Sequence, residues 1–157
     1  MNNSHHYALT LNWTGNTGSG TSSYTSYQRS HTISINNKSE ILGSSDPSFR
    51  GDPSKHNPEE LFIASISSCH MLWYLHLCAE AGIIVTKYED QTKGLMVETT
   101  DGGGKFKEVI LNPIVTISEG GDIQKAYDLH IKANEHCFIA NSLNFPISHN
   151  PTIKRGN

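Results

Sequence analysis

The stretch NPEELFIASISSCHMLWYLHLCAEAG, residues 57–82, decides the fold of this 157-residue chain. Asn57 is a favoured helix N-cap, Pro58 suits the first helical position, and two glutamates follow in the first turn, where the helix dipole favours negative charge. Gly82 is a typical residue just beyond a helix C-terminus. The stretch therefore predicts one long helix over residues 58–81, about 36 Å in length at 1.5 Å per residue.

The predicted helix is apolar on nearly every side, so other elements must cover it all round. A single domain of this size, with only 36% hydrophobic residues, has little apolar surface to spare for that purpose. A homodimer that packs two such helices together would solve the problem. Residues 61–79 carry no formal charge and are long enough to span a membrane, but five polar side chains make them a poor lipid-facing helix and favour a buried soluble one.

The rest of the chain reads mainly as strands, which gives an α+β fold rather than a repeating βαβ pattern. Residues 14–30 are rich in Gly, Ser and Thr and are interpreted as a loop or edge hairpin that lies over a site. The final strand contains two prolines, which predicts an edge position. One domain over residues 1–157 is expected, ordered as N-terminal strands and loop, central helix, hairpin, second helix and final strand: 7–56, 58–81, 83–117, 122–136 and 145–153.

Charge and cysteine content narrow the classes of function. Twelve basic against fifteen acidic residues give a net charge of −3, so no basic excess exists to neutralise the phosphates of a nucleic acid. Three cysteines are too few, and odd in number, for a disulfide scaffold, which indicates a reducing compartment. The N-terminus MNNSHH shows no basic or apolar region of a secretory signal. We therefore expect a cytoplasmic protein without a nucleic-acid or membrane partner.

The cysteines differ in their surroundings. Cys69 lies on the predicted helix among serines and a histidine, whereas Cys78 is flanked by apolar residues. Nine residues turn a helix by about 900°, so the two thiols face opposite ways. Cys78 is interpreted as a small buried hydrophobic residue. Cys137, directly after the second predicted helix, is the other candidate reactive thiol.

Two cysteine motifs make the sequence recognisable. Residues 57–70, NPEELFIASISSCH, and residues 135–143, EHCFIANSL, together resemble the OsmC/Ohr family of osmotically inducible and organic hydroperoxide resistance proteins. The resemblance extends from about residue 7 to 153 and includes three smaller matches: Gly82-Ile83, Tyr88 and Leu111-Asn112-Pro113. It implies an OsmC-like fold, an intertwined homodimer in which long central helices pack against antiparallel-rich sheets.

The resemblance also implies an antioxidant activity, thiol-dependent reduction of organic hydroperoxides without metal or organic cofactor. Cys69 would become a sulfenic acid and then form a disulfide with Cys137, which a dithiol such as a lipoyl group would reduce. Cys69 lies about three turns inside its helix, too far from the N-terminus for the helix dipole to activate it. The family uses an arginine held by a glutamate, here Glu59, and the arginine is either Arg50 or Arg29.

Apolar side chains near Cys69 are candidates for binding the hydrocarbon part of a peroxide, with the alternative that all of them face the core: Phe62, Ile66, Trp73 and Tyr74. The sequence departs from better-known family members because Phe138, rather than proline, follows the second cysteine. Each of these two cysteines also has a histidine neighbour.

These residues admit three other interpretations. A zinc site and a cysteine hydrolase are both disfavoured, because adjacent Cys and His side chains point apart on a helix and no Cys-x-x-Cys spacing exists. A non-catalytic module that binds a small apolar ligand in the same fold is the main alternative to a peroxidase.

Overall fold

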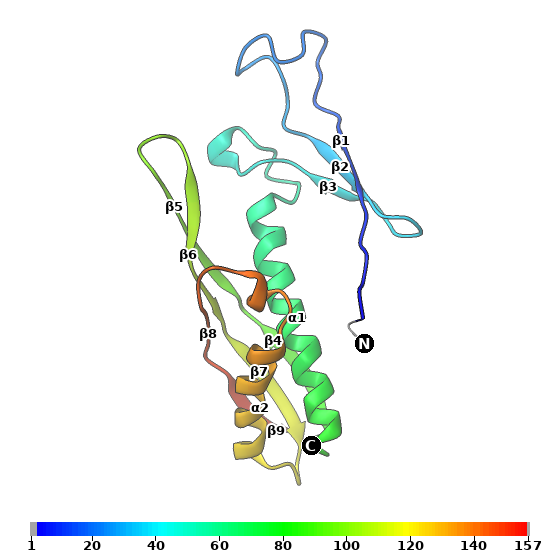
Figure 1. The fold of residues 1–157 in the computed structure, drawn as a ribbon, viewed down its shortest axis with the longest axis vertical. Helices are drawn as coiled ribbons and strands as arrows, with labels where there is room; N and C mark the ends of the chain where they lie inside the picture. Colours follow the sequence, from blue (N-terminus) through cyan, green and yellow to red (C-terminus); the bar gives the residue numbers. More distant parts are fainter. Residues whose placement is uncertain (1–2, 157) are drawn as a thin grey trace. The chain divides into compact units, whose positions relative to one another are not determined.

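The computed structural model describes residues 3–156, which form an α+β structure of two compact units, Met1–Leu61 and Phe62–Asn157 (Figure 1). The first unit holds a three-stranded antiparallel sheet in the order β1-β2-β3: Thr10–Trp13, His31–Ser34 and Ile41–Gly43. The loop over residues 14–30 connects β1 to β2. The Trp13 indole N–H closes this loop by donating to the carbonyl of Gln28 at 2.8 Å.

The long helix α1 spans Pro58–Glu80, one residue shorter than the sequence predicts. Its start is fixed by a reciprocal pair of bonds: the Asn57 side chain accepts from the Glu60 N–H at 2.8 Å, and the Glu60 carboxylate accepts from the Asn57 N–H at 3.2 Å. Gly82 follows the helix with φ +73°, a left-handed conformation that glycine adopts without strain.

The predicted hairpin over 83–117 is present but divided into four strands, β4 to β7: Val85–Asp90, Lys93–Glu98, Gly104–Leu111 and Pro113–Ser118. The outer strands β4 and β7 pair with each other, and so do the inner strands β5 and β6. Asp90 lies at the division. Its carboxylate accepts from the backbone N–H of Asn112 at 2.7 Å and from the hydroxyl of Thr92 at 2.8 Å, which pins the chain where both sides of the hairpin bend.

The C-terminal region completes two sheets. Helix α2 spans Ile123–His136, one residue shorter than the sequence predicts, because Asp122 is its N-cap. The final strand is broken at Pro151 into β8 (Ile147–His149) and β9 (Thr152–Gly156). Each adds a parallel edge to one half of the hairpin, so that the sheet orders are β5-β6-β8 and β4-β7-β9.

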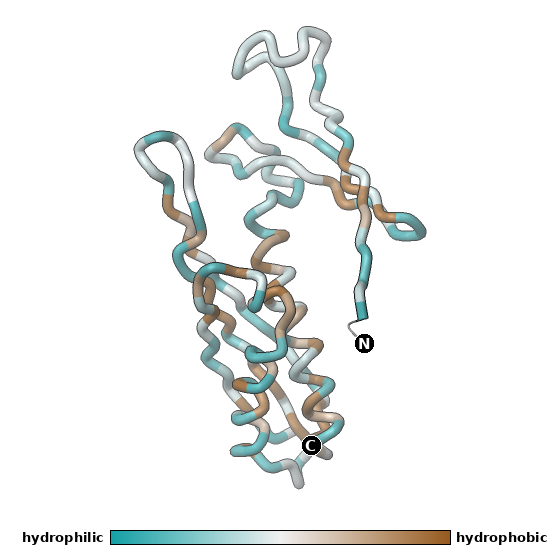
Figure 2. The backbone as a smooth tube through the Cα atoms, viewed as in Figure 1, coloured by the Kyte–Doolittle hydropathy of each residue, from teal (hydrophilic) through white to brown (hydrophobic). Residues whose placement is uncertain are grey.

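Two apolar clusters fill the second unit, and Figure 2 shows the hydrophobic residues along its strands and helices. The larger cluster joins α1 and α2 to β7 and β9; the smaller one joins α1 to β6 and β8. Helix α1 buries only one stripe at four-residue spacing: Ile66, His70, Tyr74 and Cys78. Other apolar residues of α1 remain uncovered in a single chain, Leu72 being 62% exposed. By length and composition α1 is also the one described helix that is able to span a membrane.

Candidate functional site

The structure brings Cys69 and Cys137 together. Cys69 lies in the middle of α1 and is partly exposed, while Cys137 directly follows α2 and is almost completely buried. Solvent therefore reaches the Cys69 thiol but not the Cys137 thiol. The two side chains are close enough for the Cys69 thiol to affect the ionisation of Cys137.

Burial distinguishes the chemistry of the two thiols. Removal from water raises the pKa of Cys137 to about 11, and the neighbouring Cys69 thiol adds to the rise. Cys137 is therefore a neutral thiol at pH 7. The backbone N–H of Ala140 donates to the Cys137 sulfur at 3.4 Å, so a donor is already in place for negative charge that develops on this sulfur.

Aromatic side chains flank the thiol pair. Trp73 lies one helical turn after Cys69, on the same side of α1. Its ring lies edge-on to the ring of Phe138, with ring centroids 5.5 Å apart, and 5.1 Å from the ring centroid of His136. Phe138 and His136 are the two residues on either side of Cys137. Phe138 is 69% exposed. The position at which this sequence departs from better-known family members therefore places an open aromatic face next to Cys137.

The other predicted lining residues lie in the cores. Phe62 packs on the ring of Phe106 at 4.7 Å. Ile66 and Tyr74 have no exposed surface and belong to the two different clusters. These two side chains therefore offer no surface to a substrate within a single chain. Cys78 is buried beside Tyr74, and burial raises its pKa, as expected for a structural cysteine.

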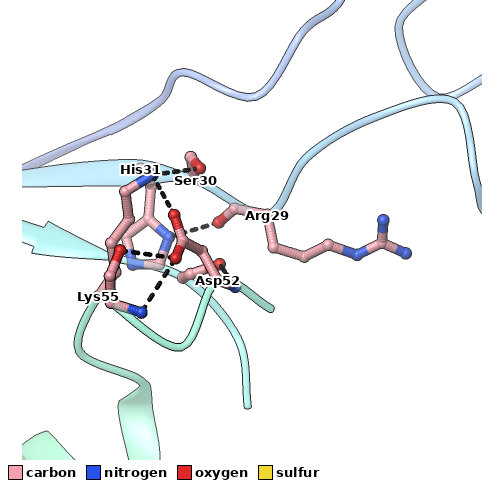
Figure 3. Close-up of polar contacts among 7 residues, drawn as sticks. Arg29, Ser30, His31, Asp52 and Lys55 are labelled. Atoms are coloured by element: carbon pink, nitrogen blue, oxygen red, sulfur yellow. Dashed lines mark hydrogen bonds and ion pairs between the residues drawn. The ribbon is translucent and has the colours of Figure 1, made fainter. Parts of the chain in front are cut away.

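Both candidate arginines belong to the first unit and line one cavity of about 490 Å³ there, with hydroxyl-bearing neighbours. Arg29 is held by its own loop: it donates to the carbonyls of Tyr27 and Tyr24 at 2.7 and 2.8 Å, and its guanidinium lies over both tyrosine rings. In Figure 3 it points away from the Asp52–Lys55 ion pair. Arg50 is exposed and has a left-handed backbone, φ +65°.

Glu59 lies in the first turn of α1. One of its carboxylate oxygens, Oε2, is buried and has no hydrogen-bond partner among residues 3–156. A buried carboxylate oxygen without a donor is costly, so this atom favours the approach of a cation or N–H group from elsewhere.

Sequence reasoning missed a buried pair of histidines beside the thiols. His70 Nε2 and His130 Nδ1 are 3.0 Å apart, and neither ring has more than 1% exposure. The His130 ring stacks on Tyr74 at 3.7 Å, and His149 of β8 lies 5.6 Å from the His70 ring. In the sequence, His70 belongs to a row of α1 residues at four-residue spacing, and this spacing indicates side chains that face a core. Nothing in the sequence relates it to His130.

The histidines are not arranged for metal binding or for hydrolysis. Within the described part of the chain, no three His, Cys, Asp or Glu side chains converge on a point where they would hold a metal ion. His70 is bonded to His130, and His136 Nδ1 lies 2.9 Å from the carbonyl of Lys132. Neither of these bonds involves a thiol that the histidine would activate as a base.

Comparisons with known proteins identify the family to which this chain is related. The family described as OsmC-like protein matches residues 51–152. An OsmC-like protein of unknown function from Vibrio cholerae has a solved structure that is 29% identical and superposes with a TM-score of 0.83, covering 95% of this chain and 100% of its own. An organic hydroperoxide resistance protein from Elizabethkingia anophelis is 21% identical, with a TM-score of 0.71 and coverage of 99% and 100%. The OhrB organic hydroperoxide resistance protein of Bacillus subtilis is 19% identical, with a TM-score of 0.64 and coverage of 94% and 98%. None of the curated proteins matches the sequence.

Proposed function

Because this chain belongs to the OsmC-like family, we propose that it is a cysteine-based peroxidase that reduces organic hydroperoxides. The observation that carries the proposal is the thiol pair, a partly exposed Cys69 against a buried Cys137. In this family's best-known chemistry such a pair alternates between dithiol and disulfide. Three structural relatives have names that contain "organic hydroperoxide resistance", and these names support the same direction.

The first step is attack by the Cys69 thiolate on the outer oxygen of the hydroperoxide. The O–O bond breaks, the alcohol ROH leaves with a proton, and Cys69 becomes a sulfenic acid. Cys137 is unsuited to this step, because it is almost completely buried and a peroxide that arrives from solvent does not reach it.

The second step joins the two sulfurs. Cys137 attacks the sulfur of the sulfenic acid, the S–O bond breaks, and the hydroxyl leaves as water with the Cys137 proton. The N–H of Ala140 stabilises the charge that develops on Cys137 during this attack. A dithiol reductant then reduces the disulfide by exchange and leaves as its own disulfide, so no metal or organic cofactor takes part.

Activation of Cys69 requires a cation, since only a few per cent of an ordinary thiol is ionised at pH 7. Arg29 or Arg50 supplies this cation, held by the Glu59 carboxylate. The buried, unpaired Oε2 of Glu59 supports this assignment, because it is the atom that a guanidinium would satisfy. Arg29 is the better candidate of the two, since its loop already orients it through two backbone carbonyls.

The substrate has an apolar body. Trp73 and the exposed ring of Phe138 provide an aromatic surface beside the thiols. Each methylene that a substrate buries there adds about 0.8 kcal/mol of binding free energy. Two or three such groups give a preference of some tens-fold over hydrogen peroxide, because about 1.4 kcal/mol is a factor of ten. A homodimer, which covers the open apolar side of α1, is the assembly proposed for this activity.

The test is a thiol count combined with initial rates. The fully reduced protein, which has three cysteines, should retain one titratable thiol after one equivalent of cumene hydroperoxide. With dihydrolipoamide as reductant, cumene hydroperoxide should be consumed faster than hydrogen peroxide. Cys69→Ser should abolish consumption, and Cys137→Ser should leave a sulfenic acid that dimedone traps. No loss of thiols would contradict the proposal and favour a module that binds apolar ligands without catalysis.

A further inference from the structure

The His70–His130 pair has no part in the peroxidase steps described above, yet it occupies the centre of the second unit. The other core residues of the two helices are apolar or aromatic: Tyr74, Cys78, Ala126, Leu129 and Ala133. His149 of β8 also lies beside both rings. A charged or polar group in such surroundings needs a specific reason, because apolar residues of similar volume would fill the space at lower cost.

The pair is also incompletely satisfied. Its single hydrogen bond uses His70 Nε2 and His130 Nδ1, while His70 Nδ1 and His130 Nε2 are buried with no partner among the described residues. In either tautomer one ring N–H therefore lacks an acceptor. Buried polar atoms of this kind destabilise a fold, so their presence indicates a function other than stability.

The hydrogen bond crosses between the two helices that carry the reactive thiols. On α1, His70 directly follows Cys69, so a rotation of the helix about its axis turns both side chains by the same angle. His130 lies on α2, and Cys137, the residue that directly follows the helix, comes seven positions later, about 700°, which is within 20° of two full turns. His130 and Cys137 therefore lie along one side of α2, and the histidine bond and the thiol contact are two links between the same two helices.

Disulfide formation is sensitive to this geometry. A disulfide tolerates only a narrow range of Cα and Cβ separations. Turning α1 by about 20° moves the Cβ of Cys69 by about 1 Å, because that atom lies a little outside the 2.3 Å radius of the Cα atoms. A 3.0 Å bond between rings that packing holds in place prevents such a rotation. Stacking of His130 on Tyr74 fixes the α2 side of this link.

We propose that His70 and His130 are positioning residues that hold Cys69 and Cys137 in register for disulfide formation. The pair acts on the second step of the proposed function, the attack of Cys137 on oxidised Cys69, and leaves the attack of Cys69 on the peroxide unchanged. The proposal rests on the proposed function only for its biological meaning, because the register of the two thiols can be measured without a peroxide.

The first measurement is the equilibrium between the dithiol and the disulfide in mixtures of reduced and oxidised dithiothreitol. Oxidised dithiothreitol accepts the two electrons and two protons of the thiols, so no peroxidase activity is required. His70→Leu and His130→Leu should each lower the equilibrium constant for disulfide formation at least tenfold. The double variant His70→Gln/His130→Asn should stay within threefold of wild type, because the two amides place polar atoms where Nε2 and Nδ1 lie and rebuild the bond.

Ser67→Ala is the matched control for stability. The Ser67 hydroxyl donates to Asp90 of β4, so its removal loosens α1 from the sheet at a point two residues from Cys69 without touching the link to α2. It should lower the melting temperature and leave the dithiol equilibrium within threefold of wild type. If a leucine variant does not fold, His130→Asn and His130→Gln are tested instead. Asn places a polar atom at the position of Nδ1, so the dithiol equilibrium should stay near wild type. Gln places that atom one bond farther from the backbone, so the equilibrium constant for disulfide formation should fall.

The second measurement is the lifetime of the Cys69 sulfenic acid after one equivalent of cumene hydroperoxide. Removal of the histidine bond should lengthen this lifetime at least tenfold and leave the rate of sulfenic acid formation unchanged. A folded His130→Leu protein with a wild-type dithiol equilibrium would overturn the proposal, and so would a folded amide pair that fails to restore it. If the wild-type protein does not react with peroxide, but the histidine variants still change the dithiol–disulfide equilibrium in dithiothreitol, only the proposed function is overturned.

Discussion

Acidification should destabilise this protein through the buried histidines. Burial lowers the pKa of His70 to about 4 and that of His130 to about 3, from an ordinary value of 6.5. His149 faces both rings and opposes their protonation, while the negative charge of Asp90 favours protonation of His70 and is outweighed by burial. Both histidines are therefore neutral in the folded state at pH 5 and protonated in the unfolded state.

The sign and size of the effect follow from this difference. A group with a lowered folded pKa that is neutral when deprotonated stabilises the fold fully above pH 6.5, and this stabilisation is lost as the pH falls through 6.5 towards the folded pKa. Between pH 7 and pH 5, each histidine then removes about 2 kcal/mol from the free energy of unfolding, or about 4 kcal/mol for the pair. That loss is a large part of the 5–15 kcal/mol or so typical of a domain.

Urea unfolding followed by tryptophan fluorescence at fixed protein concentration measures this loss directly. Wild type should lose about 4 kcal/mol more between pH 7 and pH 5 than the variant His70→Gln/His130→Asn, whose amides do not titrate. His76→Gln is the control on the same helix, because the His76 side chain is 56% exposed and pairs with Glu80 at the surface. Equal pH dependence in wild type and the amide variant would refute the reasoning.

Three further predictions concern the thiols, the activating cation and the assembly. Cys78→Ser should keep at least half of the wild-type peroxidase rate, because Cys78 lies in the core away from Cys69; a loss as deep as that of Cys69→Ser in a folded protein would contradict the facing argument. Arg29→Leu should slow the reaction of the Cys69 thiol with iodoacetamide at pH 7, because it removes the proposed activating cation, whereas Arg50→Leu should slow it less; the reverse order would assign the role to Arg50. Small-angle scattering at low micromolar concentration should give the mass of a dimer, since α1 leaves residues such as Leu72 uncovered, and a folded monomer would exclude this explanation.

The helices could be predicted from the sequence because their ends are local. Asn57 and Gly82 mark the limits of α1, and Asp122 marks the start of α2, through bonds to residues no more than four positions away. The division of the hairpin could not be predicted in the same way. It depends on Asp90 reaching Asn112, 22 positions along the chain, and such a contact exists only after the strands have paired.

The same distinction applies to the site. Cys69 and Cys137 were found because their flanking residues form a motif, although the two thiols are brought together only by the fold. Ile66 and Tyr74 were candidates to line a substrate pocket because periodicity cannot distinguish a side chain that faces a pocket from one that faces the core. In the structure both have no exposed surface.

The adjacency of Cys69 and His70 shows how one helix can serve two purposes. Neighbouring side chains on a helix diverge by about 100°, which speaks against a Cys–His catalytic pair and against a shared metal ion. That divergence turns Cys69 towards Cys137 and partial exposure, while His70 enters the core and meets His130. A change in the rotation of α1 must therefore alter both contacts together. The reactive thiol pair and the buried histidine pair are coupled through one rigid helix, so a substitution in the core at His130 should be detectable in the redox chemistry at Cys69.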